Sequence, residues 1–257
     1  LESYTKDGKL YTNREEGKAR KLSSLKSFYD YYFKKNLIRT NPPRQVDVPK
    51  IKNKNIIRLD PNEIAQLLDE AESGEKLSGR QLASHEKTKV RDVAILTLLL
   101  GTGIRVSECV GLNLEDVDFN NGAIRIIRKG GNEALIYFGD EVSQALEAYM
   151  NGPRKTAEPA AGHEEALFIS LNKTRITTRS VERLVKKYSR LVTTVKKITP
   201  HKLRSTFGTA LYQETGDIYL VADTLGHKDV NTTKKHYAAI DEHRRRMAAN
   251  VVKLRES

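Results

Sequence analysis

Apolar residues recur at helical intervals along most of this chain, which predicts a mainly α-helical protein. The first such stretch follows Thr12 and Glu15, whose three-residue spacing is that of a capping box. Its apolar stripe consists of Ala19, Leu22, Leu25, Tyr29, Tyr32 and Phe33. We expect this stripe to pack into a core rather than to stack on bases.

A second and larger helical region begins at Asp60, where an N-cap, a first-turn proline and a capping-box glutamate occur together. An apolar helix is predicted over residues 93–100, ended by Gly101 and Gly103. The polar residues 75–89 before it are expected to form a surface loop. Further helices are predicted over residues 140–150, 178–191, 200–213 and 218–225.

Between residues 115 and 139 the apolar period changes from that of a helix to that of a strand. Asn121-Gly122 is a hairpin turn signal, and residues 123–127 and 134–138 are rich in β-branched, aromatic and other apolar side chains. Two or three antiparallel strands are therefore expected. The predicted fold class is mainly α with a small antiparallel β-sheet (α+β).

Prolines and basic residues separate the two helical regions. Residues 41–58 contain Pro42, Pro43 and Pro49, and proline keeps such a segment extended. The expected organisation is a helical segment over residues 1–45, a basic linker over 46–58, a large domain over 59–242 and a tail helix over 243–257. Because one helix is too little for a stable domain and the chain begins with Leu1, we expect it to be a fragment of a longer protein.

The chain carries a formal net charge of +12, and residues 1–60 hold 15 Lys and Arg against 7 Asp and Glu. Such an excess favours a polyanionic partner, because neutralised phosphates release their counterions. A basic protein without such a partner is the plain alternative. The linker region is expected to contact a phosphate backbone rather than solvent alone, through Arg44, Lys50, Lys52, Lys54 and Arg58.

The single cysteine, Cys109, cannot form an internal disulfide and lies in an apolar helical run. A packing role in a reducing cytoplasm is therefore expected for it. The sequence contains neither a long uninterrupted apolar span nor a basic-then-apolar leader. These features predict a cytoplasmic protein with no membrane segment.

Six residues of the second region have side chains suited to a phosphodiester: Arg105, Lys129, His201, Arg204, His227 and Tyr237. Guanidinium groups clamp phosphate oxygens, and His201 and Arg204, one helical turn apart, project from one face. An ammonium or an imidazole can move a proton, and a phenol can attack phosphorus when cations stabilise the phenolate. The sequence has no dense carboxylate cluster to hold Mg²⁺ or Zn²⁺, so we expect covalent tyrosine chemistry without a metal or other cofactor. Taken alone, each residue is explainable as ordinary surface or helix chemistry, and the His201–Arg204 spacing by itself favours an ordinary surface pair.

Four ordered motifs resemble the conserved boxes of the tyrosine recombinase/integrase family, of the bacterial Xer-like or mobile-element type. They are Gly101-Thr-Gly-Ile-Arg-Val-Ser-Glu108, Ile127-Arg-Lys-Gly-Gly131, His201-Lys-Leu-Arg-Ser-Thr-Phe207 and Leu225-Gly-His-Lys-Asp-Val-Asn-Thr-Thr-Lys-Lys-His-Tyr237. The resemblance covers residues 55 to 245 or so, and its four motifs occur in the family's order.

The resemblance implies a role for each residue. Arg105 and Arg204 form a phosphate clamp, Lys129 protonates the 5′ hydroxyl leaving group, Tyr237 forms a 3′-phosphotyrosine, His201 assists proton transfer, His227 completes the phosphate-binding set, and Glu108 orients the site. The implied fold is a tyrosine-recombinase catalytic domain, preceded over residues 1–45 by part of a helical core-binding domain. Together the two are expected to form a clamp around duplex DNA.

The activity that the resemblance implies is site-specific DNA recombination without metal or ATP. The implied partner is double-stranded DNA, bound by a homotetramer that dissociates to monomers in free solution. Two alternatives stay open on the sequence: a type IB topoisomerase-like relaxation of one duplex, and a non-enzymatic DNA-binding regulator. The tail over residues 243–257 docks either on a neighbouring protomer or on its own domain. The sequence does not distinguish chromosome-dimer resolution from transposon or phage integration, and does not name the target site.

Overall fold

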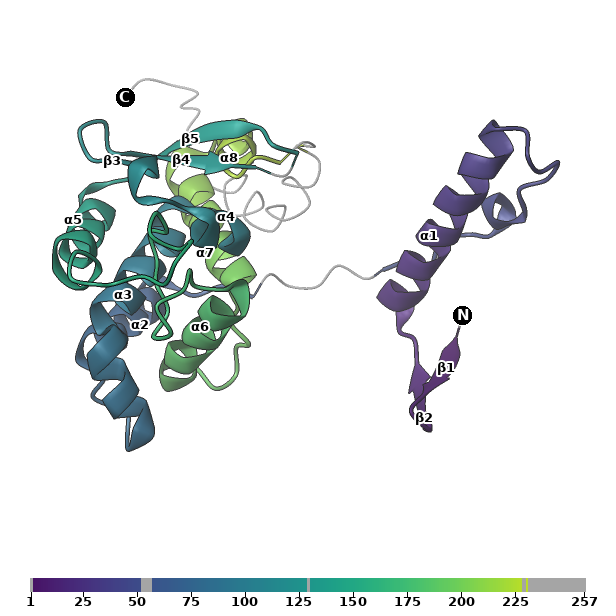
Figure 1. Ribbon diagram of the computed structural model, residues 1–257. Coiled ribbons are helices and arrows are strands. Elements are labelled where there is room, and N and C mark those ends of the chain that lie inside the picture. Colours follow the sequence, from purple (N-terminus) through teal and green to yellow (C-terminus); the bar gives the residue numbers. More distant parts are fainter. Residues whose placement is uncertain (1, 52–56, 129, 228–229, 231–257) are drawn as a thin grey trace, which may run out of the picture. The chain divides into compact units, whose positions relative to one another are not determined.

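The computed structural model describes residues 2–51, 57–128, 130–227 and 230. The chain divides into two compact units, Leu1–Asn55 and Ile56–Ser257, which we describe separately. Both are mainly helical with small antiparallel sheets (Figure 1), which confirms the predicted fold class. None of the helices in the described ranges is long and apolar enough to cross a membrane.

The first unit contains a hairpin, one long helix and a short 3-10 turn. Its elements are β1 (Ser3–Lys6), β2 (Lys9–Thr12), α1 (Glu15–Lys34) and η1 (Pro42–Gln45). The hairpin turns at Asp7 and Gly8, which both have positive φ, as a two-residue hairpin turn of the primed type requires. The stacked rings of Tyr4 and Tyr11 join the two strands across the sheet.

Three expectations for the first unit are wrong in whole or in part. The predicted capping box at Thr12 does not form, because Thr12 ends β2 opposite Ser3 and the residue before α1 is Arg14. The predicted core stripe is buried only at its start, where Ala19 and Leu22 lie. Farther along α1 the stripe opens, since Leu25 is 40% exposed and Phe33 is 38% exposed. The turn η1 also interrupts the segment that the prolines predict to be extended.

The second unit contains seven α-helices and a three-stranded sheet within its described residues. In chain order its elements are α2 (Pro61–Ser73), α3 (Arg80–Thr102), α4 (Val106–Gly111), η2 (Leu114–Asp116), β3 (Val117–Asp118), β4 (Ala123–Ile127), β5 (Glu133–Tyr137), α5 (Asp140–Tyr149), the π-helical turn η3 (Met150–Arg154), α6 (Thr178–Val192), α7 (Pro200–Thr215) and α8 (Ile218–Thr224). The sheet is antiparallel in the order β3-β4-β5. The predicted capping box at the start of α2 is confirmed, because Asp60 and Glu63 exchange two hydrogen bonds of 2.9 Å.

Helix α3 forms the centre of this unit and packs against α2, α5, α6 and α7 (Figure 1). Its residues Ile95, Leu96 and Leu98 are fully buried, as the apolar run predicts. Cys109 lies in the same core with no exposed surface, and burial raises the pKa of its thiol to about 12. The cysteine therefore packs as an apolar side chain, as expected.

The end of α3 is shaped by close packing against α7 and α8. The helix runs through Gly101 and ends at Gly103, which has φ +64° and closes the last turn onto Leu99. A Cβ atom at Gly103 would overlap the ring of Phe207 in α7 and touch Leu225 after α8. Only glycine fits both the positive φ and this contact.

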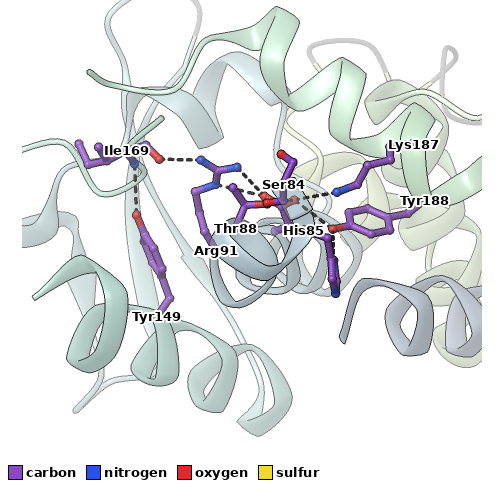
Figure 2. A network of polar contacts seen from close by, with 9 residues as sticks. Ser84, His85, Thr88, Arg91, Tyr149, Ile169, Lys187 and Tyr188 are labelled. Carbon is purple, nitrogen blue, oxygen red and sulfur yellow. Dashed lines mark hydrogen bonds and ion pairs between the residues drawn. The ribbon is translucent and has the colours of Figure 1, made fainter. Parts of the chain in front are cut away.

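A buried polar network joins α3 to α6 (Figure 2). The Asp92 carboxylate, 3% exposed, accepts hydrogen bonds from Thr88 at 3.0 Å and from the Tyr188 hydroxyl at 3.1 Å. It also forms ion pairs with Arg91 at 2.7 Å and Lys187 at 3.4 Å. One carboxylate thus has four partners from two helices, which is what a buried charge requires.

The expected surface loop over residues 75–89 is wrong beyond residue 79, because α3 begins at Arg80. Polar side chains that suggested a loop, among them His85 and Thr88, face inward and are hydrogen bonded. His85 is fully buried, and its Nδ1 lies 3.0 Å from the Tyr188 hydroxyl. Desolvation lowers the pKa of His85 and so favours the neutral imidazole.

We expect Asp92→Asn to lower the free energy of unfolding by about 2–3 kcal/mol, because it leaves Arg91 and Lys187 without their anion in a buried site. The matched change Asp69→Asn, at an exposed position of α2, is expected to alter it by no more than about 0.5 kcal/mol. Urea unfolding followed by circular dichroism measures both. Equal effects of the two substitutions would contradict this account of the network.

Candidate active site

The C-terminal end of α8 forms the centre of the candidate active site. The helix closes in a Schellman turn, in which Gly226 N–H donates to Asp223 O at 2.8 Å and His227 N–H donates to Ala222 O at 2.8 Å. Gly226 adopts φ +59°, as this turn requires. The carbonyls of Thr224, Leu225 and Gly226 have no partner within the helix and lie at its negative pole.

The two arginines predicted as a phosphate clamp both donate to this helix end. Arg105 Nη2 lies 3.3 Å from Gly226 O, and Arg204 Nη2 donates to Leu225 O. Arg204 Nη1 also donates to Gly103 O at 2.6 Å, so its guanidinium bridges the ends of α3 and α8. The structure therefore brings together two guanidinium groups that lie about a hundred residues apart in sequence, on consecutive carbonyls.

A buried carboxylate holds Arg105 in this position. Glu108 is 7% exposed, and one of its oxygens accepts from Arg105 Nη1 at 2.7 Å. Its other oxygen accepts from the Arg105 backbone N–H at 2.7 Å and caps α4. Side chain and backbone of Arg105 are thus fixed by one residue, which gives Glu108 the geometry of an orienting group.

The two histidines occupy the helix ends beside the arginines. His201 lies in the first turn of α7, one turn before Arg204. The His201 side chain is exposed, whereas Arg204 is buried, with 6% of its surface exposed. His227 is half-buried and directly follows the Gly226 carbonyl that accepts from Arg105. His201 therefore shares a helix with Arg204, and His227 follows the turn to which both arginines donate.

A third arginine, Arg128, reaches the same helix end from the end of β4. Its Nη2 donates to Thr224 O at 3.1 Å and to Asp223 O at 3.4 Å. The sequence singles out Arg128 only as a basic neighbour of Lys129, because a contact spanning some 95 residues leaves no local signal. Figure 1 shows α8 beside β4 and β5, in agreement with these bonds.

Several predicted residues lie outside the described part of the chain. Among the proposed catalytic residues these are Lys129 and Tyr237, and among the linker residues they are Lys52 and Lys54. The tail over residues 243–257 also lies outside it.

The described linker residues are placed on the first unit and at the start of the second. Arg44 donates from Nε to Asp30 at 2.7 Å and lies 5.9 Å from the Phe33 ring centre, with its side chain 55% exposed. Lys50 is exposed, and Arg58 is half-buried. Arg44 therefore has a structural contact in addition to the DNA contact expected of it.

Among the described residues, no group of three or more His, Cys, Asp or Glu side chains is arranged to hold a metal ion. The carboxylate that touches the clamp, Glu108, is occupied by Arg105. The chemistry that this arrangement can perform is that of fixed cations around an anion: binding a phosphate and stabilising charge on it.

Comparisons with known proteins agree with this chemistry. The phage integrase family model matches residues 57–244. The chain is 37% identical over 218 residues to tyrosine recombinase XerC of Thermodesulfovibrio yellowstonii, covering 84% of this chain and 69% of the relative. It is 30% identical over 232 residues to tyrosine recombinase XerD of Oceanobacillus iheyensis, covering 88% and 74%.

Solved structures give the same fold. The Tn1549 transposon integrase in complex with circular intermediate DNA superposes with a TM-score of 0.67 at 25% identity, covering 91% of this chain and 78% of that one. The XerH site-specific recombinase bound to its palindromic DNA substrate superposes with a TM-score of 0.70 at 22% identity, covering 92% and 67%. These comparisons favour neither a topoisomerase nor a non-enzymatic regulator. The chain belongs to the phage integrase family and is a tyrosine-type site-specific recombinase.

Proposed function

We propose that this enzyme cuts and rejoins double-stranded DNA at specific sites through a covalent 3′-phosphotyrosine on Tyr237, without metal or ATP. One observation carries the proposal: Arg105 and Arg204 converge on consecutive carbonyls directly before His227. Guanidinium groups on neighbouring acceptors are close enough to bind one phosphate together, and their planar forks suit its oxygens.

The reaction consists of two phosphoryl transfers. The Tyr237 oxygen attacks the scissile phosphorus and loses its proton, the bond from phosphorus to the 5′ oxygen breaks, and Lys129 gives that oxygen a proton. The Tyr237 proton passes to His201 or to solvent. His201 assists proton transfer, and His227 adds a hydrogen bond to the phosphate. A 5′ hydroxyl of the partner duplex then attacks the phosphotyrosine and gives its proton back to Lys129, and the released Tyr237 oxygen takes up a proton. Each step exchanges one phosphodiester for another, so no external energy source is required.

The clamp acts mainly on charge that develops in the transition state. Negative charge spreads over the nonbridging phosphate oxygens as the reaction proceeds, and positioned cations stabilise it without having to reorganise. Glu108 supplies this preorganisation for Arg105, and the Gly103 carbonyl supplies it for Arg204. Both arginines are therefore already in position before DNA binds.

The proposed function also includes DNA contacts outside the active site and an assembly of several chains on DNA. Arg44, Lys50, Lys52, Lys54 and Arg58 neutralise backbone phosphates along the linker region. The Tn1549 integrase structure holds DNA, which supports duplex DNA as the partner. An enzyme that acts on DNA in a bacterial relative works in the cytoplasm, which is the place of action proposed for this chain. Exchange between two duplexes breaks four strands and so requires four active sites, which a homotetramer on DNA supplies. The proposed state in free solution is a monomer. The tail over residues 243–257 docks on a neighbouring protomer in that assembly.

We expect the wild-type chain to form a denaturation-resistant adduct with nicked duplexes drawn from a random-sequence pool, and Tyr237→Phe to form none. This substitution removes only the phenolic oxygen and its proton, so the adduct depends on them. Gel electrophoresis under denaturing conditions measures the adduct, and sequencing the retained DNA identifies the site. The control Tyr219→Phe removes an exposed phenol of α8 and is expected to leave the adduct intact. An equal adduct from Tyr237→Phe would overturn the proposed function.

Arg204→Ala is expected to slow adduct formation at least about 100-fold while DNA affinity changes by less than about fivefold, because a clamp arginine stabilises the transition state more than the bound state. Single-turnover cleavage and fluorescence anisotropy measure the two quantities. Arg80→Ala, which removes an exposed guanidinium at the start of α3, serves as the control. Equal losses of affinity and rate would show that Arg204 serves binding rather than catalysis.

A further inference from the structure

Arg128 anchors the turn that follows β4. Its backbone N–H donates to Asn132 O at 2.8 Å, and its backbone carbonyl accepts from Gly131 N–H at 3.0 Å. Both backbone groups therefore close the turn between β4 and β5. Lys129, the proposed general acid, is the next residue in the chain.

The side chain of Arg128 ties the same turn to α8. Its Nη2 donates to Thr224 O at 3.1 Å and Asp223 O at 3.4 Å, 96 and 95 residues away. A hydrogen-bond donor on a guanidinium at the negative pole of a helix is favoured by charge as well as by geometry. The turn is thereby attached to a helix end rather than left as a separate hairpin tip.

The helix end is shaped to receive this guanidinium. A Cβ atom at Gly226 would overlap Nη1, Cζ and Nε of Arg128, so the guanidinium packs against the bare Cα of that glycine. Arg128 Nε is buried and, in the part of the chain that the structure describes, has no hydrogen-bond partner. A buried polar atom left unpaired costs free energy that an arginine extended into solvent would avoid. The contact with α8 therefore outweighs this cost.

Arg128 shares this helix end with the phosphate clamp. The next carbonyls, those of Leu225 and Gly226, accept from Arg204 and Arg105. The root of the turn is therefore fixed to the same four-residue segment as both clamp arginines. The position of Arg128 relative to Arg105 and Arg204 is therefore set by the end of α8, to which all three side chains donate.

We infer that Arg128 is a positioning residue for Lys129: it fixes the root of the turn to α8 and so sets Lys129 in register with the phosphate held by Arg105 and Arg204. The inference rests on the proposed function, in which Lys129 protonates the departing 5′ oxygen. A general acid acts only within hydrogen-bond reach of its acceptor, and a misplacement of about 1 Å costs about 100-fold in rate. Loosening the root of the turn should therefore impair proton donation and spare the clamp.

A substrate whose leaving group needs no proton separates a loss of proton donation by Lys129 from a loss of phosphate binding by Arg105 and Arg204. The probe is a nicked duplex recovered from the adduct selection, made with either oxygen or sulfur as the 5′ bridging atom. A thiol ionises at a pKa of about 8.5, so a 5′ thiolate leaves without an acid. The full-length chain is used with both duplexes, and adduct formation is measured in single turnover.

Arg128→Ala is expected to slow cleavage of the oxygen duplex about 100-fold and cleavage of the sulfur duplex less than about threefold. Lys129→Ala is expected to give the same pattern, since it removes the acid itself. Arg128→Lys, which keeps one donor near the carbonyls of α8, is expected to recover part of the loss on the oxygen duplex. The matched control Arg125→Ala removes a guanidinium from β4, three residues before Arg128, where it pairs with Asp116 instead. It should change neither rate by more than about threefold.

The outcomes distinguish the inference from the proposed function. Equal slowing of both duplexes by Arg128→Ala, or no slowing of the oxygen duplex, would overturn the positioning role while wild-type cleavage still supports the proposed function. Slowing of the sulfur duplex by Arg128→Lys would also overturn the positioning role. That variant keeps the positive charge, so a loss on a substrate that needs no acid would show an effect on phosphate binding and not on proton donation. An absence of adduct from the wild-type chain on both duplexes would overturn the proposed function and this inference with it.

Discussion

The carbonyl groups at the C-terminal end of α8 are the acceptors on which the candidate active site depends. A helix ends with carbonyls that no residue of the helix can satisfy, and its aligned peptide dipoles make that end negative. Here arginines from three distant segments, Arg105, Arg128 and Arg204, satisfy them. The unpaired carbonyls of this short helix therefore bring three guanidinium groups together, and these are the kind of cations that bind a phosphate. Stability and chemistry are served by one set of contacts, because α8 itself contributes only a small apolar cluster around Val221 and Leu225.

Helices α3 and α7 hold this helix end in place. Helix α3 is the buried centre of the core, and its end at Gly103 packs against Phe207 and Leu225. The carbonyl of Gly103 accepts from Arg204, so the end of α3 and the end of α8 are joined through one guanidinium. Along α3, the buried Asp92 network fixes the helix to α6. The geometry of the clamp thus depends on the packing of the largest helices, one of which, α7, carries Arg204.

Sequence patterns predicted most elements because their signals are local. The capping box at Asp60, the apolar run of α3 and the turn at Asn121-Gly122 each act within a few residues, and the helices and strands follow them. Residues 80–89 were not predicted as helix because His85 and Thr88 are polar, whereas both are buried and hydrogen bonded. The first hairpin carries a local signal, Asp7-Gly8 between strand-forming residues, that could have revealed it. At the site, residue type and order identified candidates, but Arg128 could not be found, since its partners lie 95 residues away and are backbone atoms.

Dependence on one helix end has a further physical consequence. Displacement of α8 would remove acceptors from three guanidinium groups at once, leaving mutual repulsion among cations without compensation. In the proposed reaction a DNA phosphate would place negative charge beside the same cations, so the phosphate and the α8 carbonyls would both favour this arrangement of the three arginines. Ten residues after His227 the chain reaches Tyr237, a separation of at most about 36 Å even when fully extended. Because the chain that leaves this helix end leads to Tyr237, the end of α8 also limits where the proposed nucleophile can lie.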